Sequence, residues 1–373
     1  ITFADHFDTV TVTAIDNAAI TVNTGTTTAS STSLAIAGAT VDAATVNAAG
    51  ALTMTASTND GILTATSAGN MNVTAAAATT VNATSGGTGS LTLAAATTIT
   101  ADATGQLTLV NGDAATSLSL TSLDDVDVTT ADAATTATIS AGTVTTGAVS
   151  TIVGTSLTSL SVSGNGSATV VDTQGSNSIA SIAVSGDQDV TIVMDGADID
   201  AFTAGTGDVI TVTDTSTAGT TTLQIATTSG NVNATAAAVD VIDLAVDMNA
   251  STLTTATGAT VAINADQTGT VTLTQASATS ATNSLNLNID DSTAGITTTT
   301  TAGLVVSNTA TVALDLTDTL TATASNFGTA AVTVTGTGTA ALTLAGATTA
   351  GSIDASAMTT VVNANLAGTT TLG

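Results

Sequence analysis

The chain lacks lysine, arginine, glutamate, proline, cysteine, tryptophan and tyrosine, and its sole histidine is His6. Its 28 acidic residues are all aspartate, so the formal net charge is −28 at pH 7. Soluble domains usually mix charges of both signs on their surfaces. The aspartates of this chain therefore need cations from outside the chain to balance them.

These absences exclude several classes of function. Nucleic acids and anionic membrane surfaces are bound through lysine and arginine, and a charge of −28 opposes both. Without cysteine there are no disulfide bonds, and no run of about 18 apolar residues predicts a transmembrane helix. A Ser-His-Asp site would need His6, and glycosidases with paired aspartates usually hold sugars on aromatic side chains, which are scarce here. We therefore expect no enzymatic activity.

The residues that are present favour β-structure. Threonine makes up about a quarter of the chain, and 43% of the residues are hydrophobic. Disordered chains are poor in β-branched residues, whereas Thr, Val and Ile are abundant in this one and favour strands. The sequence thus predicts an ordered chain whose core is filled by small aliphatic side chains.

Short runs alternate apolar residues with threonine or serine. This period of two places the apolar side chains on one face of a strand and the hydroxyls on the other. Glycine, asparagine, aspartate and serine fill the intervals as turn residues. The clearest predicted strands are residues 10–13, 52–55, 91–93, 107–110, 118–120 and 332–335.

A degenerate repeat of about 20–22 residues runs through the middle of the chain. Residues 157–164 read LTSLSVSG, and residues 179–186 read IASIAVSG, 22 positions later. Residues 199–205 form a looser third copy, and residues 241–244 a further one. A unit of two short strands cannot bury its apolar face alone, whereas stacked units can.

The repeat predicts an all-β fold, a parallel β-solenoid whose degenerate coils have about 20 residues. We expect residues 1–373 to be one continuous repetitive region of about 18 coils, part of a longer or processed chain. The absence of proline lets every backbone N–H join the ladder. Tandem antiparallel β-sandwiches are the alternative, because residues 60–61, 111–112 and 165–166 are Asp-Gly or Asn-Gly pairs typical of hairpins.

The clustered aspartates suggest that the chain binds calcium. Calcium binds six to eight oxygens from carboxylates, carbonyls and amides, and turns of neighbouring coils would bring sparse aspartates together. No EF-hand is present, since its twelfth residue is glutamate. The candidate ligands are Asp124, Asp125, Asp127, Asp187, Asp189, Asp195, Asp198, Asp200, Gly205, Gly207, Asp208, Asp240, Asp243, Asp290 and Asp291.

The chain resembles the repetitive regions of bacterial surface-layer (S-layer) proteins of the RTX-related kind. The resemblance is carried by its Thr/Ala/Gly/Val/Asp-rich texture, by residues 157–164 and 179–186, and by residues 351–361. Residues 205–210 also match part of the calcium-binding RTX nonapeptide once, without tandem copies. The resemblance implies a secreted, calcium-stabilised β-solenoid that forms two-dimensional sheets on the bacterial cell.

Three functions stay open at this point. The first is an extracellular structural protein that self-assembles with calcium into a surface layer or filament, its partners being further copies and, through a segment outside this chain, cell-surface polysaccharide. The second is the repetitive stalk of a bacterial adhesin, which the full gene would identify. The third is a Thr-rich ice-binding solenoid, which requires Thr-x-Thr once per coil on one face, whereas the sequence places it irregularly.

Overall fold

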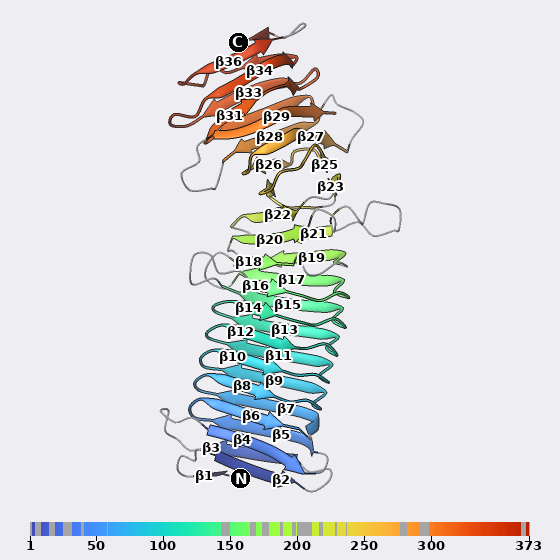
Figure 1. Cartoon of the computed structure of the whole chain (residues 1–373), viewed down its shortest axis with the longest axis vertical. Coiled ribbons are helices and arrows are strands. Elements are labelled where there is room, and N and C mark those ends of the chain that lie inside the picture. The colour runs from blue at the N-terminus through green and yellow to red at the C-terminus, as the bar shows by residue number, and fades with distance from the viewer. Residues whose placement is uncertain are drawn as a thin grey trace. The chain divides into compact units, whose positions relative to one another are not determined.

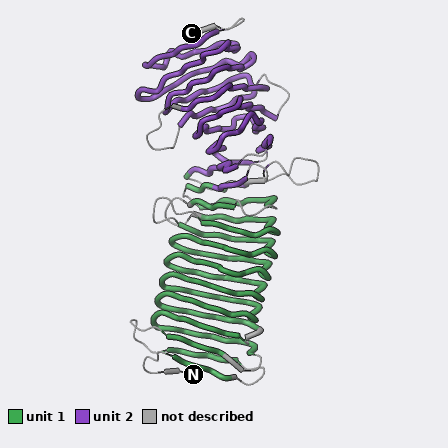
Figure 2. Tube along the Cα trace, in the orientation of Figure 1, with its two compact units in different colours: residues 1–191, 214–219 green, residues 192–213, 220–373 purple. Residues whose placement is uncertain are grey.

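The computed structural model is an all-β chain of stacked coils (Figure 1). It describes residues 2–3, 9–14, 19–24, 32–38, 41–57, 59–142, 150–164, 169–173, 179–186, 189–195, 199, 211–215, 219–227, 230–235, 237–276, 282–290, 298–366 and 371–372. Contacts within the chain divide it into two compact units, residues 1–191 with 214–219 and residues 192–213 with 220–373 (Figure 2).

Unit 1 consists of two parallel sheets, to which successive strands belong alternately. Sheet A contains β1 (Thr2–Phe3), β3 (Ala19–Thr24), β5 (Val41–Ala48), β7 (Asn59–Ser67), β9 (Thr80–Ser85), β11 (Thr98–Ala103), β13 (Ser117–Ser122), β15 (Thr136–Ala141), β17 (Ser159–Gly164) and β19 (Ser181–Ser185). Sheet B contains β2 (Thr9–Ala14), β4 (Thr32–Gly38), β6 (Leu52–Ala56), β8 (Met71–Thr74), β10 (Gly89–Thr92), β12 (Leu107–Asn111), β14 (Val126–Val128), β16 (Ser150–Ile152) and β18 (Thr169–Asp172). Each coil thus contributes one strand to each sheet.

Unit 2 repeats this plan, and its strands belong to sheet B and to a third sheet, sheet C. Its part of sheet B contains β22 (Thr221–Thr227), β24 (Val241–Leu244), β26 (Thr260–Ile263), β28 (Ser284–Ile289), β30 (Thr311–Leu316), β33 (Ala331–Gly336), β35 (Ser352–Asp354) and β37 (Thr371–Leu372). Sheet C contains β23 (Val232–Ala234), β25 (Thr252–Thr255), β27 (Gln267–Gln275), β29 (Thr298–Ser307), β31 (Thr319–Ala322), β32 (Ser325–Asn326), β34 (Leu342–Thr349) and β36 (Val362–Leu366). The division between the units falls within β20 (Val190–Asp195) and β21 (Thr211–Asp214).

The strand register confirms the predicted solenoid. In sheet A, Val81 pairs in parallel with Ile99, and Ile99 pairs with Leu118, so a coil here takes about 18 or 19 residues. Leu160 pairs with Ile182, which confirms the repeat recognised in residues 157–164 and 179–186. Every strand pair for which a register is described is parallel, which excludes antiparallel β-sandwiches for this part of the chain.

The core is a set of aliphatic columns between the two sheets. Leu63, Val81, Ile99 and Leu118 lie one above another in successive coils, and none is more than 2% exposed. Burial of each such side chain stabilises the fold by about 1.5–3 kcal/mol relative to exposure. Strands such as β9, β11 and β15 bury every second side chain, and the small aliphatic side chains among them fill a thin core.

Inward-facing serines tie the ends of the sheet A strands to the next turn. Ser85 pairs with Ser67 on one side and with Ala103 on the other. The Ser85 hydroxyl contacts the main-chain oxygens of Gly69 at 3.0 Å and Thr88 at 2.9 Å. The Ser67 hydroxyl donates in the same way to the oxygen of Gly50 at 2.7 Å. These polar side chains are buried, and their hydrogen bonds compensate their loss of water.

The coils of unit 2 vary in length, because insertions separate paired residues such as Leu273 and Val306. The alternative of hairpin turns needs correction at Asp60-Gly61, since both residues lie inside β7. Asn111-Gly112 ends β12 at a corner from which the chain passes to the other sheet, and residues 165–166 lie outside the described residues.

The prediction of one continuous region stays a prediction, because the two units are described separately. Among the described residues, no helix is long and apolar enough to cross a lipid bilayer.

Candidate functional site

The outer side of sheet A in unit 1 carries hydroxyl and amide side chains almost without interruption. We call the described outward positions of the sheet A strands from β7 to β19 the hydroxyl face. Apart from Ile62, Asp102 and Ala183, each of these positions is threonine, serine or asparagine. The register places them in three columns that run across the strands, and none of them is buried. They are Thr64, Thr66, Thr80, Asn82, Thr84, Thr98, Thr100, Ser117, Ser119, Thr121, Thr136, Thr138, Ser140, Ser159, Ser161, Ser163, Ser181 and Ser185.

A second regular array lies at the corner where the chain enters sheet A. The Thr97 hydroxyl donates to the main-chain oxygen of Thr79, 3.1 Å away in the preceding coil. Thr116, Thr135 and Thr158 repeat this contact, each with the threonine before it, at 3.2, 3.2 and 3.0 Å. We call these five residues the threonine ladder. Its signal in the sequence was a threonine directly before successive strands, which the analysis of alternating runs missed.

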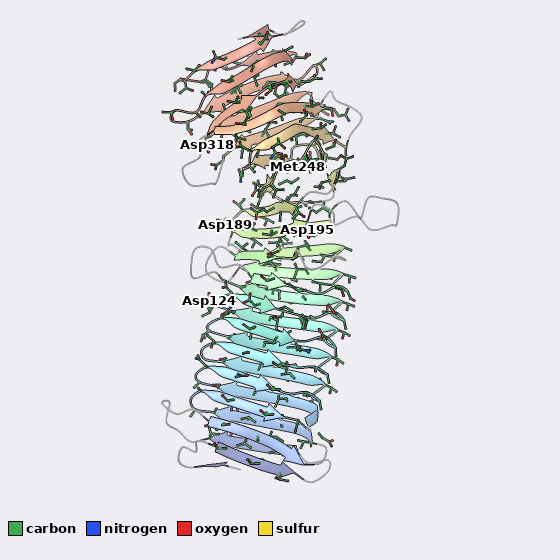
Figure 3. All side chains as sticks on the ribbon, viewed as in Figure 1. Asp124, Asp189, Asp195, Met248 and Asp318 are labelled. Atoms are coloured by element: carbon green, nitrogen blue, oxygen red, sulfur yellow. The ribbon has the colours of Figure 1, made fainter. Side chains whose placement is uncertain are left out.

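The predicted calcium ligands of unit 1 lie at turns and strand ends. Asp124 and Asp125 form the turn before β14, and Asp127 lies within that strand, where its carboxylate accepts a hydrogen bond of 2.6 Å from Gln106. Figure 3 shows Asp124 at the edge of its coil. Burial raises the pKa of Asp125, and the charges of Asp124 and Asp127 raise it further.

The remaining described candidates are spread over several coils. Asp189 precedes β20, and Asp195 ends that strand (Figure 3). The Asp195 carboxylate accepts a hydrogen bond from the Thr227 hydroxyl. The Asp240 carboxylate accepts a 2.8 Å hydrogen bond from the backbone N–H of Thr221. Each of these contacts is an ordinary role of aspartate at a strand end or turn.

Two further candidates belong to sheet B of unit 2. Asp243 lies in β24 and is buried, whereas Asp290 follows β28 and is exposed. Asp187, Asp198, Asp200, Gly205, Gly207, Asp208 and Asp291 lie outside the described residues, as does His6.

Within the described ranges, no three acidic or histidine side chains lie close enough to hold a metal ion as a group. This includes Asp124, Asp125 and Asp127, the densest cluster in the sequence. The calcium-binding role therefore stays a prediction. Asn264 is not among the predicted ligands, although its side-chain oxygen is buried without a hydrogen-bond partner.

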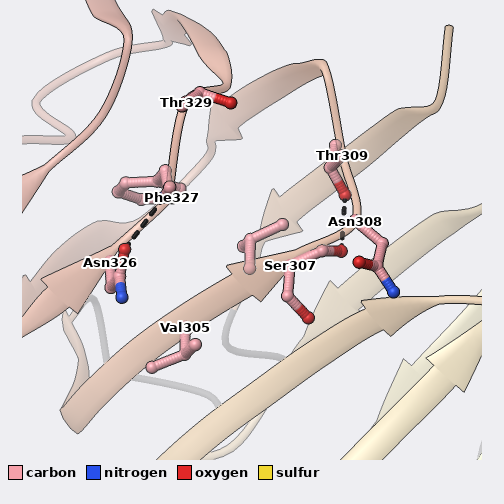
Figure 4. A pocket seen from close by; sticks show the side chains of 9 residues that line it. Val305, Ser307, Asn308, Thr309, Asn326, Phe327 and Thr329 are labelled. Atoms are coloured by element: carbon pink, nitrogen blue, oxygen red, sulfur yellow. Dashed lines mark hydrogen bonds between the residues drawn. The ribbon is translucent and has the colours of Figure 1, made fainter. Parts of the chain in front are cut away.

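A shallow hollow of about 310 Å³ lies beside β29 and the turn after β32 (Figure 4). Its turns are fixed by hydrogen bonds from the Gly328 N–H to the Asn326 side chain, 2.9 Å, and from the Thr309 hydroxyl to the oxygen of Ser307, 3.0 Å. Asn308 and Gly328 adopt the left-handed backbone conformation there, with φ of 57° and 59°. The lining residues carry no charge, so the hollow offers no acid–base chemistry.

The fold and these arrays define the class of the protein: it is a β-solenoid repeat protein. Comparisons with protein-family models, curated proteins and solved structures gave no match to the chain.

Proposed function

We propose that the chain is an extracellular structural protein of a bacterial cell surface that self-assembles, with calcium, into a layer or filament. The observation that carries the proposal is the hydroxyl face. In a chain of charge −28, this face has one acidic residue, Asp102, among its described outward positions. Two copies that meet through it bring few like charges together.

The repeating register supports such a contact. Strands in a sheet are spaced by about 4.8 Å and outward residues along a strand by about 6.7 Å, so the hydroxyls form a regular grid. A grid of this kind offers the same donors and acceptors to a copy displaced by one coil. Aspartates outside the face still repel, and a divalent cation in the solvent neutralises them. The proposal assigns no catalytic step to the chain.

Calcium dependence tests the proposal first. We expect large assemblies in millimolar CaCl2 and dissociation to smaller species after EDTA is added, measured by sedimentation velocity and negative-stain electron microscopy. Assemblies of unchanged size after complete calcium removal would overturn the role of the cation.

A matched pair of variants tests the face itself. Thr100→Asp adds a charge in the middle of the hydroxyl face, and Thr55→Asp adds the same charge to an exposed position of sheet B. We expect Thr100→Asp to prevent assembly and Thr55→Asp to retain it. Equal assembly by both variants would exclude the hydroxyl face as the interface.

The same grid favours ice binding as a second candidate function. Strict Thr-x-Thr units are scattered, residues 53–55 lying in sheet B and residues 64–66 in sheet A. When serine and asparagine are counted, however, outward polar pairs recur in coil after coil on sheet A. Thermal hysteresis in a solution of the wild type, and its loss in Thr100→Asp, would support ice binding. A wild-type solution that freezes without thermal hysteresis would exclude it.

A further inference from the structure

Two adjacent residues in one outward column of unit 2 are buried, although the column lies on the outer side of sheet B. The register aligns Gln224, Asp243, Ala262 and Asn288 on four successive strands. Their neighbours Leu244 and Ile263 face the core, so Asp243 and Ala262 face outward, since side chains alternate along a strand. Nevertheless Asp243 is only 6% exposed and Ala262 only 7%.

The Asp243 carboxylate is incompletely satisfied in this position. Its Oδ2 accepts a 2.8 Å hydrogen bond from the Gln224 side chain, whereas its Oδ1 is buried and has no hydrogen-bond partner. A buried carboxylate without compensation is costly, and no lysine or arginine exists in this chain to pair with it.

Two more oxygen-bearing side chains lie on the same side of the sheet. Asn264 and Asp290 directly follow Ile263 and Ile289, which pair with one another and face the core. The Asn264 N–H donates to the oxygen of Leu244 at 3.2 Å, and the Asp290 N–H to the oxygen of Ile263 at 3.4 Å. These bonds place Asn264 on the coil next to that of Asp243 and Asp290 on the coil after it, with adjacent coils about 4.8 Å apart.

The electrostatics agree with this placement. Burial raises the pKa of Asp243, the Gln224 hydrogen bond opposes the rise, and the charge of Asp290 adds to it. The Asn264 Oδ1 is, like the Asp243 Oδ1, buried without a partner. The Oδ1 atoms of Asp243 and Asn264, together with the Asp290 carboxylate, form a candidate cation-binding site with oxygen ligands.

We propose that Asp243, Asn264 and Asp290 bind one hard divalent cation, calcium by its preference for oxygen, across three coils of unit 2. Two carboxylates and one amide oxygen, completed by backbone oxygens and water, suit calcium and not the softer transition metals. The bound ion would supply the missing partner of both buried oxygens. The site lies within one chain, so its test does not depend on assembly.

The first measurement is calcium binding to the full chain by isothermal titration calorimetry with CaCl2, at concentrations too low for assembly. We expect Asp243→Asn to weaken the tightest binding step about tenfold or more, since even outer ligands of metal sites contribute that much. Asp102→Asn is the matched control, because it removes the same charge from an exposed strand position and leaves the tight step intact. An equal loss in both variants would overturn the site.

Thermal unfolding gives an independent readout. Calcium should raise the Tm of the wild type more than that of Asp243→Asn, whereas in EDTA the Asn variant should be at least as stable as the wild type. If Asp243 is instead a protonated acid that needs no ion, Asn substitution changes the Tm equally with and without calcium, and the proposal fails. Should Asp243→Asn not fold, Asp290→Asn at the exposed member of the site serves the same comparison.

Discussion

The main-chain oxygen of Thr79 accepts two hydrogen bonds from Thr97 in the next coil, one from its N–H at 2.8 Å and one from its hydroxyl at 3.1 Å. The next step of the threonine ladder repeats this arrangement, because Thr116 bonds in both ways to Thr97. A corner of the solenoid is thus held from coil to coil by side chains as well as by backbone. Threonine is suited to this position because it combines strand-favouring geometry with a donor.

Removing one hydroxyl of the ladder should have a small, measurable effect. Thr97→Val keeps the shape and the strand preference of the side chain and deletes its hydrogen bond. Since the bond is exposed, we expect a loss of about 0.5 kcal/mol in the free energy of unfolding, measured by urea denaturation. Thr138→Val is the control, because Thr138 is also exposed and its side chain makes no hydrogen bond to the described residues. Equal losses in both variants would mean that the ladder hydroxyls contribute nothing specific.

The inward serines should matter more, because they are buried. Ser85→Ala leaves the oxygens of Gly69 and Thr88 and the N–H of Gly87 without their hydroxyl partner. We expect a loss of about 1–3 kcal/mol, seen as a lower urea midpoint with an unchanged slope. Alanine fits this place sterically, since Ala103 occupies it in the next coil. A neutral Ser85→Ala would show that water replaces the hydroxyl.

Much of the fold could be predicted from local patterns. Residues 107–110 alternate Leu-Thr-Leu-Val and lie in β12, and residues 118–120 lie in β13. The match between residues 157–164 and 179–186 predicted the pairing of Leu160 with Ile182. Both signals depend on which side chains face the core of one coil, and that information is contained within about 20 residues.

The sites were less predictable because they depend on which coils become neighbours. Clustering of Asp124, Asp125 and Asp127 along the chain did not produce a group able to hold a metal ion. Asn264 and Asp243 are 21 positions apart and come together only because β24 pairs with β26 in one particular register. Coil lengths in unit 2 vary with insertions, so counting residues does not give that register.

Close stacking of coils leaves no room for a side chain at some turns. A Cβ atom at Gly86 would lie 2.3 Å from the main-chain oxygen of Ala68 in the preceding coil, which is far inside van der Waals contact. We therefore expect Gly86→Ala to cost about 1–3 kcal/mol, as overpacking usually does, and to lower the Tm. Gly230→Ala is the control, because nothing lies within 4 Å of its added Cβ. A Gly86→Ala protein as stable as this control would mean that the coils can separate there without cost.

The turn at Asp125 should make stability fall as pH rises. Burial, followed by the charges of Asp124 and Asp127, raises the pKa of Asp125 in the folded chain above the ordinary value of an aspartate. Between the ordinary pKa and the raised pKa the folded state binds more protons than the unfolded state, so this group lowers the free energy of unfolding as pH increases through that window. Asp125→Asn removes the effect. We expect the difference in unfolding free energy between Asp125→Asn and wild type, measured by urea denaturation in EDTA from pH 3 to pH 7, to grow in favour of the variant as pH rises. Asp102→Asn shows what removal of one exposed charge does by itself, and a difference for Asp125→Asn that stays constant with pH would contradict the raised pKa.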